Sequence, residues 1–91
     1  MHVRMVIGEV TSDRQVGEFK QIVKEHDFNG QGFQGVQQLE EENGRMVIVI
    51  TSWTTREDCI RYHSSRSYRE LVTKTQHLLI GDFVVKMFRM E

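Results

Sequence analysis

The sequence predicts an α+β domain of ferredoxin-like topology, in which one four-stranded antiparallel sheet carries its helices on one face. Two helical patterns alternate with four β-patterned runs in the order βαββαβ. Asn43-Gly44, between the two middle runs, is a strong signal for a β-hairpin. The 91 residues are enough for one hydrophobic core but not for two. We therefore expect a single domain that spans residues 1–91.

The first β-patterned run, residues 1–10, carries apolar side chains on both faces: Val3, Met5 and Ile7 on one, Val6 and Val10 on the other. Ser12 and Gln15 have the spacing of a capping box, so a helix is expected to begin near Asp13. Asn29-Gly30 is expected to end this helix. The apolar positions of the helix follow helical spacing and are Val16, Phe19, Ile22 and Val23.

The two middle strands are expected on either side of Asn43-Gly44. A two-residue turn there pairs Leu39 with Ile48. One face of the hairpin then holds Leu39, Met46, Ile48 and Ile50. The preceding segment "GQGFQG", residues 30–35, matches the glycine pattern of dinucleotide-binding loops. Because it follows a helix and opens a strand, we interpret it as a turn with a bulge.

The second helical pattern runs from about Thr55 to Leu79 and starts with the capping-box pair Thr54 and Glu57. A break is expected near Ser64-Ser65, because serine competes for backbone hydrogen bonds. Gly81 closes the segment, and residues 82–90 form the last strand. The side chains expected to face inward from the helix are Cys59, Ile60, His63, Ser67, Tyr68, Leu71, Val72, Thr75 and Leu78.

The face of the sheet that the helices leave uncovered is also apolar in the first, third and fourth strands. A solvated face of an antiparallel sheet would instead alternate toward polar and charged side chains. We therefore expect a second copy of the chain to cover it, which gives a homodimer that forms through the sheet face.

Composition excludes several classes of partner. Twelve basic residues against thirteen acidic ones argue against nucleic-acid binding, which usually requires a basic excess. Apart from Trp53, the first and third strands lack the stacking aromatics of RNA-recognition modules. The longest apolar run, Met46 to Ile50, is too short for a membrane span of about 20 residues. A single cysteine and the lack of an N-terminal apolar run lead us to expect a cytoplasmic protein.

The candidate site residues have two interpretations each. Cys59 and His63 are four residues apart on one helix, but nothing nearby completes a tetrahedral set, so no metal site is expected. His63 is either a core residue or part of a pocket. Trp53 is either core packing or a stacking wall for an aromatic ligand. The thiol, imidazole, hydroxyl and phenol on the inward stripe fit a small pocket with a few polar groups.

The stretch from Gly32 to Val72 resembles the antibiotic-biosynthesis monooxygenase family. The resembling features are the glycines that open the second strand, Trp53 followed by two threonines and an acidic helix start, and an H-x-S-x-x-[YF] pattern at His63, Ser65 and Tyr68. The resemblance implies a dimeric α/β barrel, with a pocket in each subunit between the sheet and the long helix.

Enzymes of this family include cofactor-independent oxygenases of phenolic substrates, so the resemblance implies a monooxygenase of an aromatic or quinol-type compound that needs no cofactor. It makes Trp53 a wall of the pocket, Tyr68 part of the lining, and His63 the base or an orienting donor. Histidine suits this task because the side chain titrates near neutrality. We expect Cys59 and Phe19 to complete the ligand-binding set.

The haem-degrading branch of the family is disfavoured, because Val72 stands where that branch needs an axial histidine and the first strand has no asparagine. Two alternatives stay open. One is a non-catalytic domain of the same fold that binds or senses a small ligand. The other is an isomerase or small-aldehyde-processing enzyme that uses His63 as a proton shuttle.

Overall fold

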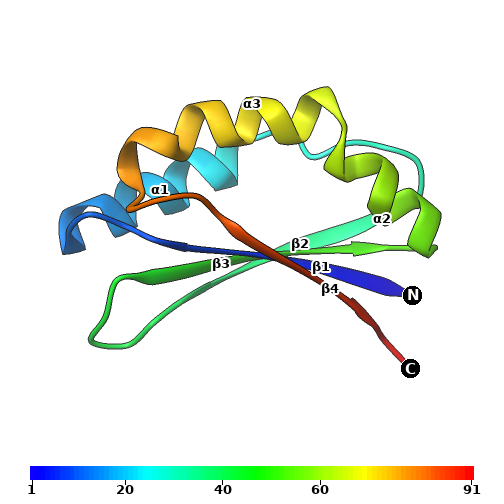
Figure 1. Cartoon of the computed structure of the whole chain (residues 1–91), viewed down its shortest axis with the longest axis horizontal. Coiled ribbons are helices and arrows are strands. Elements are labelled where there is room, and N and C mark those ends of the chain that lie inside the picture. The colour runs from blue at the N-terminus through cyan, green and yellow to red at the C-terminus, as the bar shows by residue number, and fades with distance from the viewer.

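The structure, a computed structural model, describes residues 1–91 and confirms the predicted ferredoxin-like α+β fold. The strands form one antiparallel sheet in the order β2-β3-β1-β4. All helices lie on one face of this sheet, and no element covers the other face (Figure 1). The elements are β1 His2–Glu9, α1 Asp13–Glu25, β2 Phe33–Glu40, β3 Met46–Trp53, α2 Arg56–His63, α3 Arg66–Thr75, the 3₁₀ turn η1 Gln76–Leu78, and β4 Val84–Arg89.

The central hairpin has the predicted register, with Leu39 opposite Ile48 and Gln37 opposite Ile50. Asn43 supports the turn by adopting a left-handed backbone conformation, with φ of 57°, which asparagine tolerates better than most residues. The glycine-rich segment before β2 is a turn that leads into a bulge, since the register shifts between Phe33 and Gly35. The register and the bulge match the prediction, but the predicted two-residue turn is wrong, because β2 ends at Glu40 and β3 begins only at Met46.

Gly32 lies at a position that only glycine fits well. Its φ is +80°, and a Cβ atom there would come within 2.0 Å of the Asp58 carboxylate. The Gly32 carbonyl accepts hydrogen bonds from the backbone N–H and the hydroxyl of Thr54, at 2.8 and 3.2 Å. This close approach joins the start of β2 to the segment between β3 and α2, and so fixes the end of the sheet where Trp53 lies.

The predicted helix caps are wrong in detail. Ser12 directs its hydroxyl to the side chain of Gln15, and it makes no cap bond to the backbone. The N-cap of α2 is Thr55 rather than Thr54, and its hydroxyl accepts from the backbone N–H of Asp58 at 3.1 Å. Helix α1 ends at Glu25, before Asn29-Gly30, because the extended residue His26 already closes the last turn.

The predicted break at Ser64-Ser65 is confirmed, and it divides the second helical segment into α2 and α3. The hydroxyl of Ser65 caps α3 by accepting from the backbone N–H of Tyr68. The inward stripe does not continue through the break as predicted. Ile60 and His63 are exposed, whereas Tyr62 is buried. A separate eight-residue α2 takes its own orientation over the sheet, so it buries a different set of side chains.

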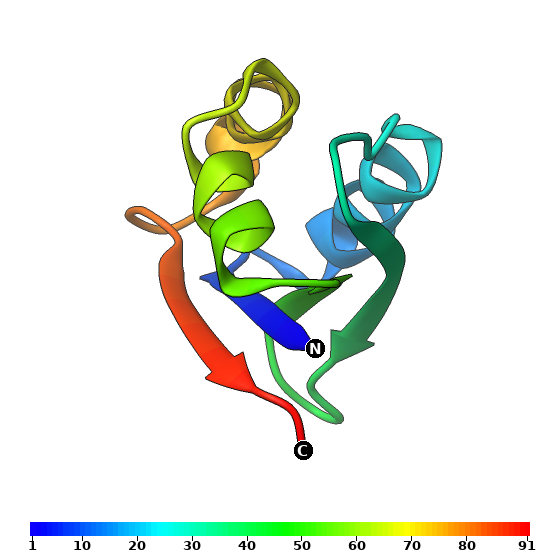
Figure 2. The same ribbon diagram turned by 90° about the vertical axis from the view of Figure 1, so that its right-hand side faces the viewer.

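The core lies between the sheet and the helices. Helix α1 covers one side of the sheet, and α2 and α3 cover the other side (Figure 2). The open face of the sheet keeps large apolar side chains in contact with solvent. Leu39, Val84 and Phe88 on this face are 51%, 53% and 46% exposed. None of the helices combines the length and the apolar character that a membrane crossing would require. The buried apolar side chains of the core are Val6, Val10, Phe19, Val23, Val47, Val49, Trp53, Cys59, Tyr62, Tyr68, Leu71 and Leu78.

Candidate functional site

A fully buried arginine, Arg4, is the centre of the candidate site. It lies on β1 between Thr51 of β3 and Met87 of β4, on the face that the helices cover. Its guanidinium carbon is 4.0 Å from the ring centroid of Tyr68 and 5.5 Å from that of Tyr62. These cation–π contacts place a permanent positive charge among aromatic rings. Sequence reasoning did not single out Arg4.

We call this guanidinium, the three rings in contact with it, and Trp53, which packs against one of those rings, the Arg4 cluster; its members are Arg4, Trp53, Tyr62, His63 and Tyr68. The only hydrogen bond of the Arg4 side chain runs from Nη2 to Nδ1 of His63, at 2.8 Å. Arginine only donates, so Nδ1 must accept, and the neutral ring carries its proton on Nε2. While this bond lasts, His63 can donate from Nε2 but cannot take a proton at Nδ1. The geometry therefore favours the orienting-donor interpretation of His63 in the resting state.

Of the other predicted site residues, Tyr68 contacts this pair directly and Trp53 contacts it only through Tyr62. The ring of His63 stacks on Tyr68, with centroids 5.5 Å apart and an angle of 28° between the planes. Trp53, only 1% exposed, packs against Tyr62 at 4.8 Å between centroids. The indole N–H donates to the hydroxyl of Thr51 at 3.0 Å, so it has the partner that a buried tryptophan needs. The structure thus brings His63 and Tyr68 against Arg4, and it places Trp53 one ring further away, behind Tyr62.

The other two predicted residues lie differently. Cys59 is fully buried, and burial raises the pKa of its thiol, although the positive charges of Arg4 and Arg56 partly oppose that rise. A buried protonated thiol is a packing residue rather than a nucleophile. Phe19 is also fully buried, but its ring neighbour is Phe83, at 6.1 Å, rather than any ring of the Arg4 cluster.

The space between the sheet and α2 is filled with side chains. None of the five main surface hollows is lined by a member of the Arg4 cluster. The expected pocket is occupied by Arg4 itself, Tyr62 and Tyr68. A ligand can reach the guanidinium only if a side chain moves, and the exposed His63 is the member of the cluster that lies at the surface.

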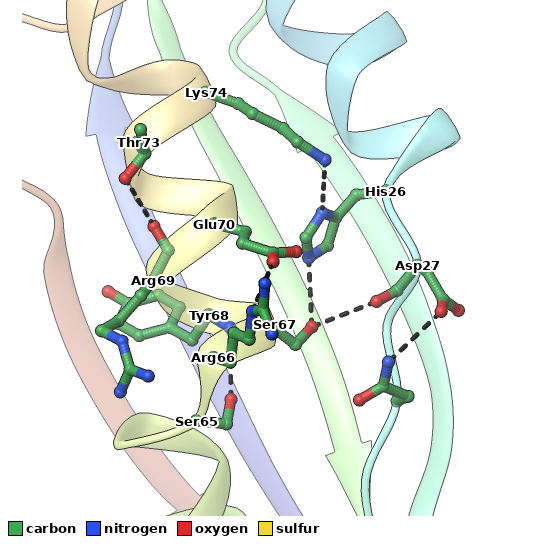
Figure 3. A network of polar contacts seen from close by, with 11 residues as sticks. His26, Asp27, Ser65, Arg66, Ser67, Tyr68, Arg69, Glu70, Thr73 and Lys74 are labelled. Atoms are coloured by element: carbon green, nitrogen blue, oxygen red, sulfur yellow. Dashed lines mark hydrogen bonds and ion pairs between the residues drawn. The ribbon is translucent and has the colours of Figure 1, made fainter.

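A second polar network joins Lys74, His26, Ser67 and Asp27 (Figure 3). Lys74 donates to Nδ1 of His26 at 3.4 Å, so Nε2 of His26 carries the proton and donates to the hydroxyl of Ser67 at 3.1 Å. That hydroxyl donates in turn to the carbonyl oxygen of Asp27 at 3.1 Å. It also lies 3.5 Å from the hydroxyl of Tyr62. The network joins the end of α1 to α3 beside the aromatic rings.

Tyr62 remains a protonated phenol in this environment. Burial raises the pKa of its hydroxyl, and the hydrogen bond with Ser67 and the charge of Arg4 offset only part of that rise. Tyr62 therefore acts as a neutral ring that faces the guanidinium. No three histidine, cysteine, aspartate or glutamate side chains are placed together so that they could hold a metal ion.

The network predicts a pH dependence of stability. Burial, followed by the charge of Lys74, lowers the pKa of His26 below 6.5, against smaller opposing effects of Ser67, Glu70 and Asp27. In the unfolded chain His26 takes up a proton near pH 6.5, whereas the folded chain resists this uptake until a lower pH. The unfolded state then binds more protons, so the free energy of unfolding should fall as the pH drops below about 6.5.

His26→Gln is the variant that tests this dependence, because a glutamine amide can still donate to Ser67 but does not titrate. Urea unfolding of both proteins between pH 7.5 and pH 5 is the measurement. We expect a smaller loss of stability in the variant than in the wild type. Parallel curves for the two proteins would show that His26 is not the group responsible.

The fold defines the class of the protein: a ferredoxin-like α+β domain with an open apolar sheet face. No protein-family model matches the chain, and no curated protein matches it. Solved structures do. A proposed antibiotic biosynthesis monooxygenase from Bordetella bronchiseptica superimposes with a TM-score of 0.84, at 13% identity over 99% of this chain and 96% of that one. A second, from Nitrosomonas europaea, gives 0.79 at 13% identity over 99% and 98%.

A variant of SnoaB, a cofactor-independent oxygenase from Streptomyces nogalater, matches with a TM-score of 0.69 and 16% identity, over 98% of this chain and 92% of that one. The chain therefore has the fold of proteins named as antibiotic biosynthesis monooxygenases. This finding confirms the resemblance seen in the sequence at the level of the fold.

Proposed function

We propose that the protein is a cofactor-independent monooxygenase of the antibiotic-biosynthesis monooxygenase type, which acts on a small phenol or quinol. The observation that carries the proposal is the Arg4 cluster, in which a buried guanidinium and an imidazole meet a wall of aromatic rings. Such a site can bind a planar ring and stabilise the oxyanion that forms when a phenol loses its proton. The fold that the chain shares with SnoaB supports the same class of reaction.

The chemistry needs only the substrate and oxygen. A bound phenol loses a proton, and the electron-rich phenolate gives one electron to O₂. The two radicals combine to a peroxide at a ring carbon, and this peroxide eliminates water. One phenol and one O₂ therefore give one quinone and one water, and the substrate supplies all the electrons. The protein contributes a site free of bulk water and hydrogen bonds to the developing oxyanion.

His63 has two roles in this scheme. In the resting protein its Nδ1 is occupied by Arg4. When a ligand oxygen replaces it at the guanidinium, Nδ1 becomes free to accept the phenolic proton, which can leave to solvent because His63 is exposed. Trp53 and Tyr68 supply the ring wall. The single thiol, Cys59, is free, as suits a reducing compartment such as the cytoplasm.

A homodimer is part of the proposal, because an apolar row of side chains crosses all four strands on the open face of the sheet. One row of neighbouring residues, set by the strand registers, runs from Leu39 through Ile48 and Ile7 to Val84. A second copy that packs on this face buries the row against its own equivalent in an isologous interface. In the dimer each sheet then lies between its own helices and the sheet of the second copy, so its apolar face is shielded from water.

Oxygen uptake by chelator-treated protein with a panel of hydroquinones tests the proposed function. We expect oxygen consumption that depends on the protein. Added catalase should return no oxygen, because the second oxygen atom leaves as water and not as hydrogen peroxide. A panel that gives no uptake above the rate of autoxidation would contradict the proposal. Binding without uptake would identify the second candidate, a non-catalytic domain that binds or senses a small ligand.

His63→Ala should lower the rate of oxygen uptake by about tenfold or more, as expected for the loss of an acid–base group. The matched control is His77→Ala, because His77 is exposed on η1 and lies outside the Arg4 cluster. This control should keep the wild-type rate. Equal rates for His63→Ala and the wild type would show that His63 has no catalytic role and serves only as a hydrogen-bond acceptor for Arg4.

A further inference from the structure

Arg4 carries a buried charge without a counter-charge. The residue is 0% exposed, and none of the five ion pairs of the chain includes it. Its Nε is a buried polar atom without a hydrogen-bond partner. Buried charges in proteins are usually paired, because an unpaired one loses its hydration without compensation. The cation–π contacts with Tyr62 and Tyr68 offset only part of that cost.

The unpaired atom lies on a particular edge of the guanidinium. Nε and Nη2 form the edge that a carboxylate approaches side-on, with one oxygen for each N–H. Nη2 now bonds to Nδ1 of His63, and Nε bonds to nothing. One neutral ring nitrogen thus stands where two anionic oxygens would satisfy both donors. Only one of the two N–H donors on this edge therefore has a hydrogen-bond partner.

The surface next to Arg4 is also positive. A hollow of about 510 Å³ lies at the end of the sheet where β1 starts and β4 ends. Met87, the cross-strand partner of Arg4, forms part of its wall. The other lining residues are His2, Arg56, Phe88 and Arg89, and none of them is acidic. In Figure 1 both chain termini and α2 lie at this end. A negatively charged ligand is therefore attracted toward the side of the fold that holds Arg4.

We propose that the protein selects a small aromatic carboxylate, whose two carboxylate oxygens displace His63 and pair with Nε and Nη2 of Arg4. The rings of Tyr62 and Tyr68 then flank the aromatic part of the ligand. This inference rests on the proposed function, since it names the charge class of the substrate for the same site. It explains why a strand position in the core keeps an arginine where an apolar side chain would pack at lower cost.

Benzoate and benzamide are the matched probes, because they share shape and size but differ in charge and do not react with oxygen. Emission of Trp53, the only tryptophan, and the melting temperature report binding. We expect wild-type protein to bind benzoate at least about tenfold more tightly than benzamide, as a charged hydrogen-bonded pair permits. Arg4→Met should abolish the difference and melt at the same or a higher temperature. Arg4→Lys should retain only part of it.

Arg66→Met is the control variant, because it removes the same charge from an exposed position on α3 and should keep the preference for benzoate. Equal binding of the two probes by wild-type protein would overturn the inference, and so would a preference that survives Arg4→Met. Because the probes do not react, the result is independent of catalysis. Charge-selective binding without oxygen uptake would refute the proposed function alone, and oxygen uptake without charge selectivity would refute this inference alone.

Discussion

Replacing Trp53 with alanine is expected to lower the free energy of unfolding by about 3–5 kcal/mol, the range for large aromatic side chains in a core. Trp53 is 1% exposed and packs against Tyr62 and Phe33, with ring centroids 4.8 and 5.3 Å away. Its removal opens a cavity and also leaves the hydroxyl of Thr51 without its donor. Domains of this size are stable by only about 5–15 kcal/mol, so the variant should be close to unfolding.

Urea unfolding followed by circular dichroism measures this effect. Trp53→Phe is the companion variant, since it keeps an aromatic ring but loses the N–H, and it should cost less than the alanine variant. A loss below about 1 kcal/mol in Trp53→Ala would contradict the structure, because that value is typical of surface or loosely packed positions.

Replacing Ile48 with lysine is expected to weaken the homodimer by at least about a hundredfold. Ile48 lies in the middle of the open face, between Leu39 of β2 and Ile7 of β1. Across a two-fold interface every substitution occurs twice, so two apolar side chains are lost and two charges are buried. Each tenfold change in affinity corresponds to about 1.4 kcal/mol, so a hundredfold change requires about 2.8 kcal/mol. The two buried lysines of the variant dimer are expected to cost at least this much.

Sedimentation velocity at micromolar concentration measures the mass of wild-type and variant protein. The control is Ile60→Lys, which introduces the same change at a 40% exposed position on α2, away from the open face. We expect wild type and Ile60→Lys to sediment as dimers and Ile48→Lys as a monomer. A monomeric wild type would contradict the dimer that we propose.

Much of the fold could be predicted because its determinants are local. The Asn43-Gly44 turn sets the hairpin register, and the paired serines end a helix after His63. The helix caps were less predictable, because Thr54 and Thr55 are both competent and the tertiary contact with Gly32 decides between them. Thr54 is engaged by the carbonyl oxygen of Gly32, which leaves Thr55 to cap α2.

The candidate site was only partly predictable. Trp53, His63 and Tyr68 were identified, but Arg4 and Tyr62 were missed. Arg4 has the same strand parity as Val6 and Val10, but both faces of the first strand are apolar, so the sequence did not show which face the helices cover. Tyr62 was missed for another reason: the break after His63 changes the face that α2 buries, and a stripe drawn along one continuous helix selects the wrong neighbour.

The central claim is that the Arg4 cluster supports oxygenation without a cofactor, and the fate of the oxygen atoms tests it most directly. The measurement is mass spectrometry of the product formed from hydroquinone by chelator-treated protein under isotopically labelled O₂. We predict a hydroxylated quinone that carries one labelled oxygen atom, with the second atom recovered as water. Unlabelled quinone formed with hydrogen peroxide, at a rate that His63→Ala leaves unchanged, would contradict the account.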